Sequence, residues 1–420
     1  MSKRYVHIVG AGLSGLSCAL QLSLLGESVV LYDAAPFAGG RCRSFLDKEL
    51  GTRIDNGNHL ILSGNEATQN FLRLTNSTDQ LYNSGKAVFP FIDVYHDAKW
   101  QIEFNNGRIP WWLFNKNKRI PDTTLIDYLS IAKLFSARKD STLGFLENPR
   151  SSLYNKFWKP LIIGALNTEP EEASAKLLKK IFTQIFFKGG KACVPLFPKV
   201  GLTETFIDPC LSVLEDNLVD IRFYHRLKSL MWEGDTVREL LFNNDTVIEI
   251  APKDWVVLAL PAWVMSDVLP EVPAPTEFRS ILSAHFRVDS SIELEHNFTG
   301  IINGHAEWLF VRNGVASVTT SCAERYRNIP PREMAYLVWR DVAKVLDLNE
   351  ERVPAHRIFL EKCATIAATP EEEHKRPSSF TGWHNIALAG EWTATELPST
   401  IEGAIRSGIK AAQIVRRWNN

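Results

Sequence analysis

The chain has 420 residues, of which 45% are hydrophobic and 23% charged, an ordinary globular composition with room for two domains. The formal net charge of −1 provides no bulk attraction to nucleic acid, so no nucleic-acid partner is expected. The six cysteines form no C-x-x-C pair, which argues for reduced thiols in the cytoplasm and against a metal site or a disulfide framework. No apolar run of about 18 residues occurs and the first expected strand begins near residue 5, so neither a membrane span nor a signal peptide is expected.

The stretch 5–33 has the pattern of a dinucleotide-binding βαβ unit. Residues 5–9 and 28–32 predict two buried strands, and apolar residues at helical spacing predict a helix between them. Residues 10–15 fit G-x-G-x-x-G, whose glycines permit a tight turn, close approach of a pyrophosphate and close helix–strand packing. The helix N-terminus attracts phosphate, and an acid that follows the second strand can bind ribose hydroxyls. The predicted nucleotide-binding residues are Gly10, Gly12, Leu13, Ser14, Gly15 and Asp33; the alternative is a glycine-rich turn without a ligand.

A second glycine motif, Gly39-Gly40-Arg41, follows the second predicted strand directly. It places a close backbone and a cation beside the pyrophosphate, whereas nicotinamide dehydrogenases usually continue into another helix here. This G-G-R-x-R-S segment resembles the flavin-containing amine oxidase and carotenoid desaturase superfamily. The resemblance implies FAD as the cofactor, with Gly39, Gly40 and Arg41 among its ligands. The alternative is a surface turn that carries two arginines.

Residues 54–62 predict a polar, glycine-containing loop that leads into a strand. In the flavoproteins of that superfamily the matching segment passes close to the flavin ring. The resemblance therefore makes Gly57 a cofactor residue, and Asp55, Asn58 and His59 become candidates for the catalytic site. Taken alone, each of these polar residues would more often be a capped loop residue or a satisfied histidine.

The middle of the chain predicts a second domain that the chain visits twice. Residues 83–195 look mostly helical and irregular, and the acidic run 169–172 predicts the first turn of a helix. Residues 254–261 predict a buried parallel strand that returns to the nucleotide sheet. The other predicted elements are an extended segment at 193–198, a helix at 203–214, small antiparallel strands at 219–223, 226–232, 237–242 and 246–250, strands at 292–294, 308–311 and 315–320, and a helix around 332–346.

Basic and aromatic residues are concentrated between residues 111 and 200. This window holds 15 Lys/Arg against 7 Asp/Glu, a net charge of +8, and it is rich in Trp and Phe. Such a combination suits a membrane interface, where basic residues meet anionic lipids and aromatic side chains enter the bilayer. The alternative is that the aromatic residues form a core and the basic residues a solvated face.

The C-terminal segment predicts a strand at 385–389, followed by Gly390-Glu391 and a helix over 403–418. Ser399 to Glu402 fits a capping box, with Ser399 as N-cap and Glu402 at the third helical position. A Gly–acid pair before a helix N-terminus suits the ribityl chain and the electron-rich edge of a flavin. The predicted cofactor residues here are Gly390, Glu391, Ser399, Thr400 and Ile401.

Four blocks make the chain similar to the hydroxysqualene dehydroxylases of bacterial hopanoid biosynthesis, also called squalene-associated FAD-dependent desaturases. They are residues 10–15 with 39–41, 55–59, 157–174 and 390–404. The chain departs from the usual family pattern at Asn58, where Gln is usual, at Glu391, where Asp is usual, and in residues 63–65. The resemblance implies an α/β fold: a Rossmann-like FAD-binding domain of the glutathione-reductase and amine-oxidase type, with an interleaved α+β substrate domain. We expect the FAD-binding domain at 1–82, 196–268 and 356–420, and the substrate domain, with a membrane-facing helical part, at 83–195 and 269–355.

The resemblance also implies reductive removal of the hydroxyl group of hydroxysqualene, which gives squalene and water. Hydroxide is a poor leaving group, so we hypothesise that Asp55 or His59 protonates it, beside Asn58, and that reduced flavin delivers a hydride. A separate electron donor is expected because no second G-x-G-x-x-G occurs. The alternatives are a polyprenoid desaturase of the phytoene type, an amine oxidase, and a non-catalytic flavoprotein scaffold.

The size of the implied substrate favours a location at the inner face of the cell membrane. Transfer of about thirty carbons from water at ~0.8 kcal/mol each would sum to roughly 24 kcal/mol, above the ceiling of about 18–21 kcal/mol for non-covalent binding. Water is therefore the wrong reference state, and passage from the bilayer to an apolar tunnel is expected.

Overall fold

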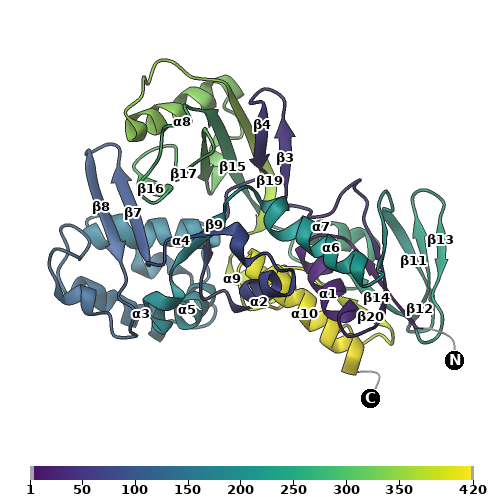
Figure 1. The fold of residues 1–420 in the computed structure, drawn as a ribbon. Coiled ribbons are helices and arrows are strands. Elements are labelled where there is room, and N and C mark those ends of the chain that lie inside the picture. Colours follow the sequence, from purple (N-terminus) through teal and green to yellow (C-terminus); the bar gives the residue numbers. More distant parts are fainter. Residues whose placement is uncertain (1–3, 418–420) are drawn as a thin grey trace.

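In the computed structural model, which describes residues 4–417, a five-stranded parallel sheet carries the predicted nucleotide unit (Figure 1). Its strands are β1 (Tyr5–Val9), β2 (Ser28–Tyr32), β10 (Asp220–Arg222), β14 (Trp255–Leu258) and β20 (Ile386–Leu388). They lie in the order β10-β2-β1-β14-β20, and every neighbouring pair is parallel. One sheet therefore gathers strands from the beginning, the middle and the end of the chain.

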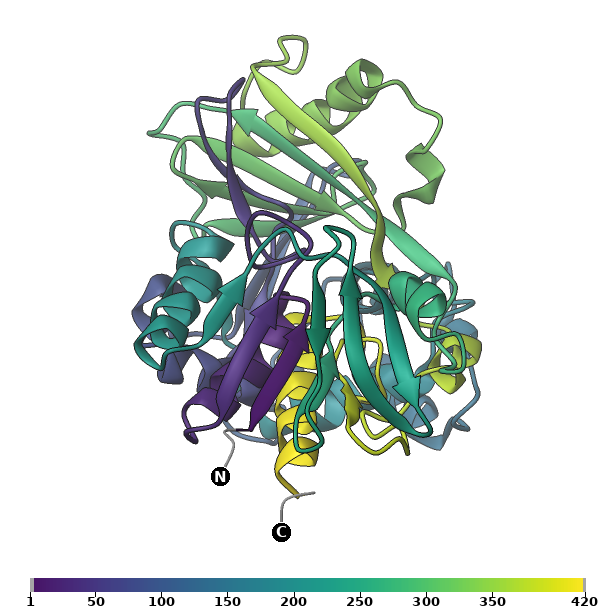
Figure 2. The same ribbon diagram turned by 90° about the vertical axis from the view of Figure 1, so that its right-hand side faces the viewer.

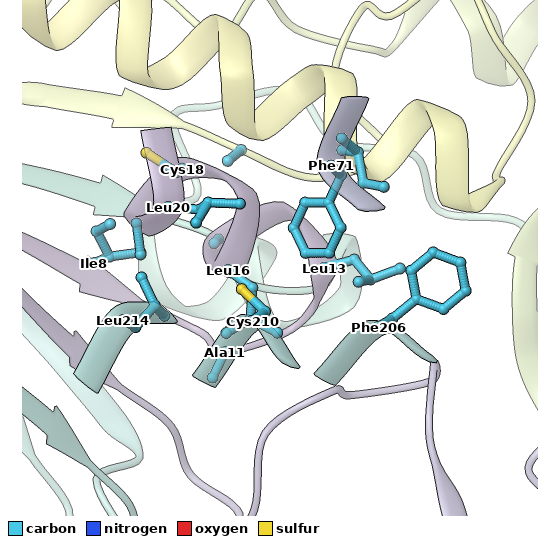
Figure 3. Packing of buried hydrophobic residues seen from close by; sticks show 14 of the residues in the cluster. Ile8, Ala11, Leu13, Leu16, Cys18, Leu20, Phe71, Phe206, Cys210 and Leu214 are labelled. Carbon is cyan, nitrogen blue, oxygen red and sulfur yellow. The ribbon is translucent and has the colours of Figure 1, made fainter. Parts of the chain in front are cut away.

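Both faces of this sheet are buried, which explains why its strands read as continuous apolar runs. Side chains alternate between the two faces along a strand. Ile8 and the other side chains on its face of the sheet pack against one set of helices, and Val30 lies on the opposite face. The first set is α1 (Leu13–Ser23), α6 (Asp208–Asp216) and α10 (Ile401–Arg417); Figure 3 shows Leu16 of α1 beside Cys210 and Leu214 of α6. The other face carries a small antiparallel sheet, β11 (Leu227–Glu233), β12 (Thr236–Phe242) and β13 (Val247–Glu249), and α7 (Ala262–Val268).

A second, seven-stranded sheet stands above the first. Its strands are β7 (Val88–Asp93), β8 (Ala98–Glu103), β15 (Phe278–Arg287), β16 (Phe298–Ile302), β17 (Trp308–Arg312), β18 (Val315–Thr320) and β19 (His356–Ile366). Their order is β19-β15-β18-β17-β16-β7-β8, and in Figure 2 the long β19 runs down toward the nucleotide sheet. Helix α8 (Pro331–Leu346) packs on the face that carries Leu282 and Val318. The neighbouring residues Ser283 and Thr319 point to the opposite face, which is left to line a cavity.

A helical part lies on the side of the molecule away from the two termini (Figure 1). It contains α3 (Ser130–Ser136), α4 (Lys159–Leu166), α5 (Ala175–Gln184) and the 3-10 turns η2 (Trp111–Phe114), η3 (Asp127–Leu129) and η6 (Phe186–Lys188). Trp112, Trp158 and Phe182 form a core between these elements. Many aromatic residues of the basic window are therefore core, whereas Trp111 and Phe114 are exposed.

Smaller elements join these parts. They are the hairpin β3 (Ser44–Asp47) and β4 (Thr52–Asp55), the sheet of β5 (Ile61–Leu62), β9 (Pro195–Pro198) and β6 (Leu81–Asn83), the helices α2 (Glu66–Leu74) and α9 (Pro370–His374), and a π-helical turn (Thr203–Ile207) that continues into α6. The hairpin and β5 bracket the predicted loop at residues 56–60, so paired backbone holds this loop at both ends.

Several predicted elements are wrong. Residues 83–195 contain β7 and β8, which the sequence does not predict. β7 pairs with β16, about 200 residues further along, and β8 joins the sheet only through β7. Residues 292–294 form no strand. The strand near 219–223 is β10, which pairs in parallel with β2 and is not part of the small antiparallel sheet. The acidic residues 169–172 precede α5, because the N–H groups of Ser174 and Ala175 donate to carbonyls outside the helix, those of Ala368 and Ser141.

The predicted domain boundary at residue 356 coincides with the start of a strand. Residues 356–366 form β19, and β19 pairs with β15 in the seven-stranded sheet. The segment 356–420, predicted as part of the FAD-binding domain, therefore begins with a strand whose pairing is in the other sheet.

Candidate active site

A cavity lies between the open face of the seven-stranded sheet, helices α4 and α5, and the start of α10. Its wall is mostly apolar and includes Phe89, Phe91, Phe104, Phe157, Phe186, Trp308 and Phe310. The polar residues of the lining include Arg41, Asn58, His59, Thr319 and Ser399. An apolar chamber with a small number of placed polar groups is the usual form of a site for an apolar ligand and a cofactor.

The glycine-rich turn after β1 leaves room for a diphosphate. A Cβ on Gly10 would lie 2.4 Å from the carbonyl oxygen of Ala259, and one on Gly15 would lie 1.8 Å from that of Gly10, so both positions require glycine. A Cβ on Gly12 would meet no atom of the described chain within 4 Å. Within residues 4–417 no side chain caps the N-terminus of α1, so its N–H groups face this open space. Leu13 and Ser14 are buried in the first turn of α1.

Asp33 and the second glycine motif surround the same turn. The Asp33 carboxylate accepts hydrogen bonds from the N–H of Ala11 (2.6 Å) and of Ala35 (2.7 Å). Burial raises the pKa of Asp33, although these two N–H groups act in the opposite direction. Gly39 donates its N–H to the Ala11 carbonyl (2.8 Å), and Gly40 has a left-handed φ of 57° that glycine adopts without strain. The predicted residues at 10–15, 33 and 39–40 are thus brought together.

Arg41 links this region to the end of the chain. It donates to the carbonyl oxygens of Ala364 (2.7 Å) and Cys363 (3.3 Å) on β19, and it forms an ion pair with Glu391 after β20. Burial favours the neutral acid, but the Arg41 guanidinium outweighs burial and holds the pKa of Glu391 below its usual range. Arg41, expected beside a pyrophosphate, therefore also joins the two sheets. Gly390 lies next to Glu391, and its N–H donates to Ser407 Oγ of α10 (2.9 Å).

The start of α10 also lines the cavity, but the predicted capping box is wrong. Thr400 Oγ1 accepts the N–H of Gly403 (3.1 Å), so Thr400 is the N-cap, while Ser399 Oγ accepts the N–H of Ile366 (3.1 Å). The Glu402 carboxylate instead accepts the N–H groups at residues 67 and 68, in the first turn of α2. Glu402 therefore caps the N-terminus of α2, a helix distant in sequence, and not that of its own helix α10. The predicted helix end at Trp418 lies outside the described residues.

Asn58 and His59 face the cavity. Asn58 donates its Nδ2–H to Thr319 Oγ1 (3.1 Å), and its buried Oδ1 has no hydrogen-bond partner in the described part of the chain. His59 donates its Nδ1–H to the carbonyl oxygen of Gly57 (2.9 Å), which leaves Nε2 for another partner. Burial lowers the pKa of His59.

Asp55, the other predicted acid, is turned away from the cavity. It is not among the described residues that line the cavity, and its buried carboxylate forms an ion pair with Arg312 (2.8 Å). The same carboxylate accepts Ser44 Oγ–H (2.7 Å) and the N–H of Leu202 (2.9 Å). Its bonds tie the β3–β4 hairpin to β17 and to the chain after β9, which is a structural arrangement.

No group of three or more His, Cys, Asp or Glu side chains in residues 4–417 is arranged to hold a metal ion. Over the same residues, no helix combines the length and the apolarity needed to cross a membrane.

Comparison with known proteins gives a family. Residues 13–416 match the family described as flavin containing amine oxidoreductase. The hydroxysqualene dehydroxylase of Sinorhizobium fredii is 41% identical over 415 residues, which cover 99% of each chain. The hydroxysqualene dehydroxylase of Rhodopseudomonas palustris is 39% identical, again over 99% of each chain. The chain belongs to the hydroxysqualene dehydroxylase family. As a member of the flavin containing amine oxidoreductases, it is a flavin-dependent oxidoreductase.

More distant proteins share the fold of this dehydroxylase family member. A zeta-carotene desaturase of Synechocystis is 25% identical, over 98% of this chain and 96% of the relative. A solved oxidoreductase from Methanosarcina mazei superposes with a TM-score of 0.72 at 14% identity, over 97% of this chain and 100% of that chain. The predicted fold class is confirmed.

The sequence does not single out two residues that support the site of this dehydroxylase family member: Thr319, which lines the cavity, and Arg376, which is not among the described lining residues but holds a loop that includes the lining residue Leu397. Thr319 holds the Asn58 side chain, and it was predicted only as part of a strand. Buried Arg376 donates to the carbonyl oxygens of Thr393 (3.0 Å) and Leu397 (2.7 Å), in the loop that leads to α10. The sequence around Arg376 does not indicate that it holds this loop, because its hydrogen-bond acceptors are backbone carbonyl groups, which every residue has.

Proposed function

We propose that the protein is an FAD-dependent hydroxysqualene dehydroxylase, which converts hydroxysqualene to squalene. The observation that carries this proposal is the Asn58 Oδ1, a buried acceptor without a partner among the described residues, in a residue that lines a mostly apolar cavity. Such an atom is costly unless a ligand donates to it, and the hydroxyl group of an otherwise apolar substrate is a donor of the right kind. The names of the relatives at 41% and 39% identity support the same substrate.

The residues around the glycine turn fit FAD. Gly10, Gly12, Leu13, Ser14 and Gly15 would hold its diphosphate, with Asp33 at the adenosine ribose and the second glycine motif beside them. Gly57, Ser399, Thr400 and Ile401, which line the cavity, would surround the flavin end together with Gly390 and Glu391, which follow β20. The bound flavin, when reduced, supplies a hydride to the substrate carbon.

The chemistry requires a proton as well as a hydride. The substrate C–O bond breaks, a C–H bond forms at the same carbon, two electrons come from the reduced cofactor, and the hydroxyl leaves as water after it gains a proton. Asn58 Oδ1 accepts the hydrogen of the substrate hydroxyl and so fixes its position. His59 provides the proton from Nε2 when its ring is in the imidazolium form, because its Nδ1–H is held by the Gly57 carbonyl, and it is left as neutral imidazole. We assign no proton transfer to Asp55, whose carboxylate is ion-paired to Arg312 outside the cavity lining.

We further propose three features that belong to this function. The substrate domain comprises residues 83–195 and 269–355 with β19 added, and the remainder forms the FAD-binding domain. Electrons reach the cofactor from a separate donor, because the sequence holds only one G-x-G-x-x-G. The protein works in the cytoplasm, at the inner face of the cell membrane, where the substrate dissolves.

The test starts with the purified flavoprotein, reduced anaerobically with dithionite. Addition of hydroxysqualene in detergent should restore the absorbance of oxidised flavin, and extraction should yield squalene in equal amount. If the reduced protein stays reduced, while the oxidised protein is bleached by a polyene, the protein is a desaturase and the proposal is wrong.

A further inference from the structure

The helical part presents a group of exposed apolar side chains at one place in the chain. Six large apolar residues between positions 109 and 129 are exposed; we call them the docking patch: Ile109 (55%), Trp111 (61%), Phe114 (65%), Leu125 (43%), Ile126 (76%) and Leu129 (65%). Large apolar side chains gathered on a surface in this way usually mark an interaction site.

The docking patch is one structural unit. Trp111 and Phe114 lie on η2 with their rings 5.8 Å apart, and the remaining members border or belong to η2 and η3. The two turns pack together because the ring of Trp112 meets that of Tyr128 edge-on at 5.7 Å. The Tyr128 hydroxyl also accepts the N–H of Ile120 (3.2 Å). The exposed side chains are therefore held on a folded base.

The charge around the patch indicates which partner it fits. Residues 105–140 contain seven Lys/Arg (108, 116, 118, 119, 133, 138, 139) and three Asp/Glu (122, 127, 140), a net charge of +4. One acid of this segment, Asp122, is paired with Lys156 (2.7 Å), and one base, Lys118, is paired with Glu103 (3.1 Å), so these two pairings leave the surplus of basic residues unchanged. Exposed Trp, Phe, Ile and Leu with a surplus of basic residues match the interfacial zone of an anionic bilayer, where apolar side chains enter below the headgroups.

The patch lies close to the cavity. Trp112, in the same turn as Trp111, contacts Phe104 edge-on at 5.6 Å, and Phe104 contacts Phe186 at 5.6 Å. Phe104 and Phe186 both line the cavity. The next residue, Phe187, is exposed and stacks on Phe135 at 5.0 Å. Contacting aromatic side chains thus connect the turn that carries the docking patch with the wall of the chamber.

We infer that the docking patch seats the protein on an anionic lipid bilayer and that the apolar substrate reaches the cavity from the bilayer past these aromatic side chains. The surface part of this inference stands on exposure and charge alone, whereas the delivery part rests on the proposed function. Passage from lipid to an apolar chamber never exposes the substrate to water, which removes the main barrier to its capture.

The experiment compares two triple variants of the full-length flavoprotein. The first is Trp111→Ser, Phe114→Ser and Ile126→Ser in the patch. The matched control is Leu218→Ser, Tyr224→Ser and Val247→Ser, which removes exposed apolar side chains (91%, 67% and 49%) from the nucleotide side. Flotation with phosphatidylglycerol-containing vesicles measures binding, and turnover is measured with substrate in vesicles and in detergent micelles. Flavin absorbance reports whether each variant is folded.

We expect wild type and control to float with anionic vesicles, less so at high salt, and the patch variant to bind at least about 100-fold more weakly. The patch variant should lose turnover from vesicles and keep turnover from micelles. Equal flotation of wild type and patch variant, or equal loss in the control, would overturn the docking surface. The docking surface would also be overturned if the wild type is a dimer, the patch variant is a monomer, and both float equally. Absence of turnover in micelles by wild type would instead contradict the proposed function and leave the flotation result intact.

Discussion

Asn58 separates recognition of the hydroxyl group from binding of the hydrocarbon chain. Replacement by Leu keeps the volume and removes the acceptor, so affinity for hydroxysqualene should fall roughly 10- to 100-fold, the value of one lost hydrogen bond in a buried site (about 1–3 kcal/mol). Affinity for squalene, which has no hydroxyl group, should not fall. Titration of the flavin absorbance with each lipid measures both constants.

The matched control is Phe310→Leu, which alters the apolar wall and leaves Asn58 in place. Phe310→Leu should weaken the binding of hydroxysqualene and of squalene by similar factors. An equal loss for both lipids in Asn58→Leu would show that Asn58 does not read the hydroxyl group.

His59 gives the reaction a predictable pH dependence. Burial lowers its pKa from the ordinary histidine value of about 6.5, so the acid form grows only as the pH falls below that value. If His59 is the acid, single-turnover flavin oxidation should be fast below its lowered pKa and slow as the pH rises through it. His59→Gln should abolish this limb and reduce the rate by about 10²–10⁴. A rate that rises with pH, or a limb that survives in His59→Gln, would exclude the assignment.

The loop from β20 to α10 illustrates how one side chain can shape an element. Arg376 donates hydrogen bonds to the carbonyl oxygens of Thr393, Leu397 and Glu391 and to the Thr395 hydroxyl (2.8 Å). It also forms an ion pair with the Glu373 carboxylate. A lysine cannot reproduce this planar set of donors, so buried carbonyl groups would lose their partners.

We expect Arg376→Lys to lower the free energy of unfolding by about 2–4 kcal/mol and to release flavin during gel filtration. Urea unfolding and the flavin-to-protein absorbance ratio measure these effects. Arg238→Lys, in a solvent-exposed pair with Glu233, is the control and should change stability by less than about 0.5 kcal/mol. If both variants unfold alike, the Arg376 contacts do not support the loop.

Whether the sequence predicts a helix or strand correctly depends on how far away in the chain the partners of that element lie. The 5–33 unit carries its whole pattern locally, and it forms as expected. Strand β7 pairs with β16, about 200 residues further along, and Glu402 caps α2, more than 300 residues away in sequence. Asp55 was a plausible acid from its neighbours, and only the position of Arg312 shows its carboxylate to be engaged elsewhere. Contacts between distant segments cannot be read from spacing.

For the whole molecule, the proposed FAD site draws on four separate segments, around residues 10–15, 39–41, 57 and 390–401. A ligand that binds only the folded state stabilises it by mass action. We therefore expect FAD at 100 times its dissociation constant to raise the free energy of unfolding of the deflavinated protein by about 2.7 kcal/mol. Riboflavin and ADP each lack one half of the FAD molecule. At the same concentration, each should raise the free energy of unfolding much less than FAD does. Urea titrations with each compound measure this, and a full effect from ADP alone would show that the flavin end contributes nothing.

The strand order of the parallel sheet has a consequence for biosynthesis. β1 and β2 leave the ribosome first, but β14, the other neighbour of β1, follows about 220 residues later, and β20, which pairs with β14, about 350 residues later. α10 then packs so closely on α1 that a Cβ on Gly408 would lie 2.1 Å from the Ser14 carbonyl oxygen. A nascent chain that already contains the complete glycine fingerprint therefore cannot yet hold its cofactor. A premature stop codon shortly before α10 would leave the fingerprint intact and still yield a colourless protein.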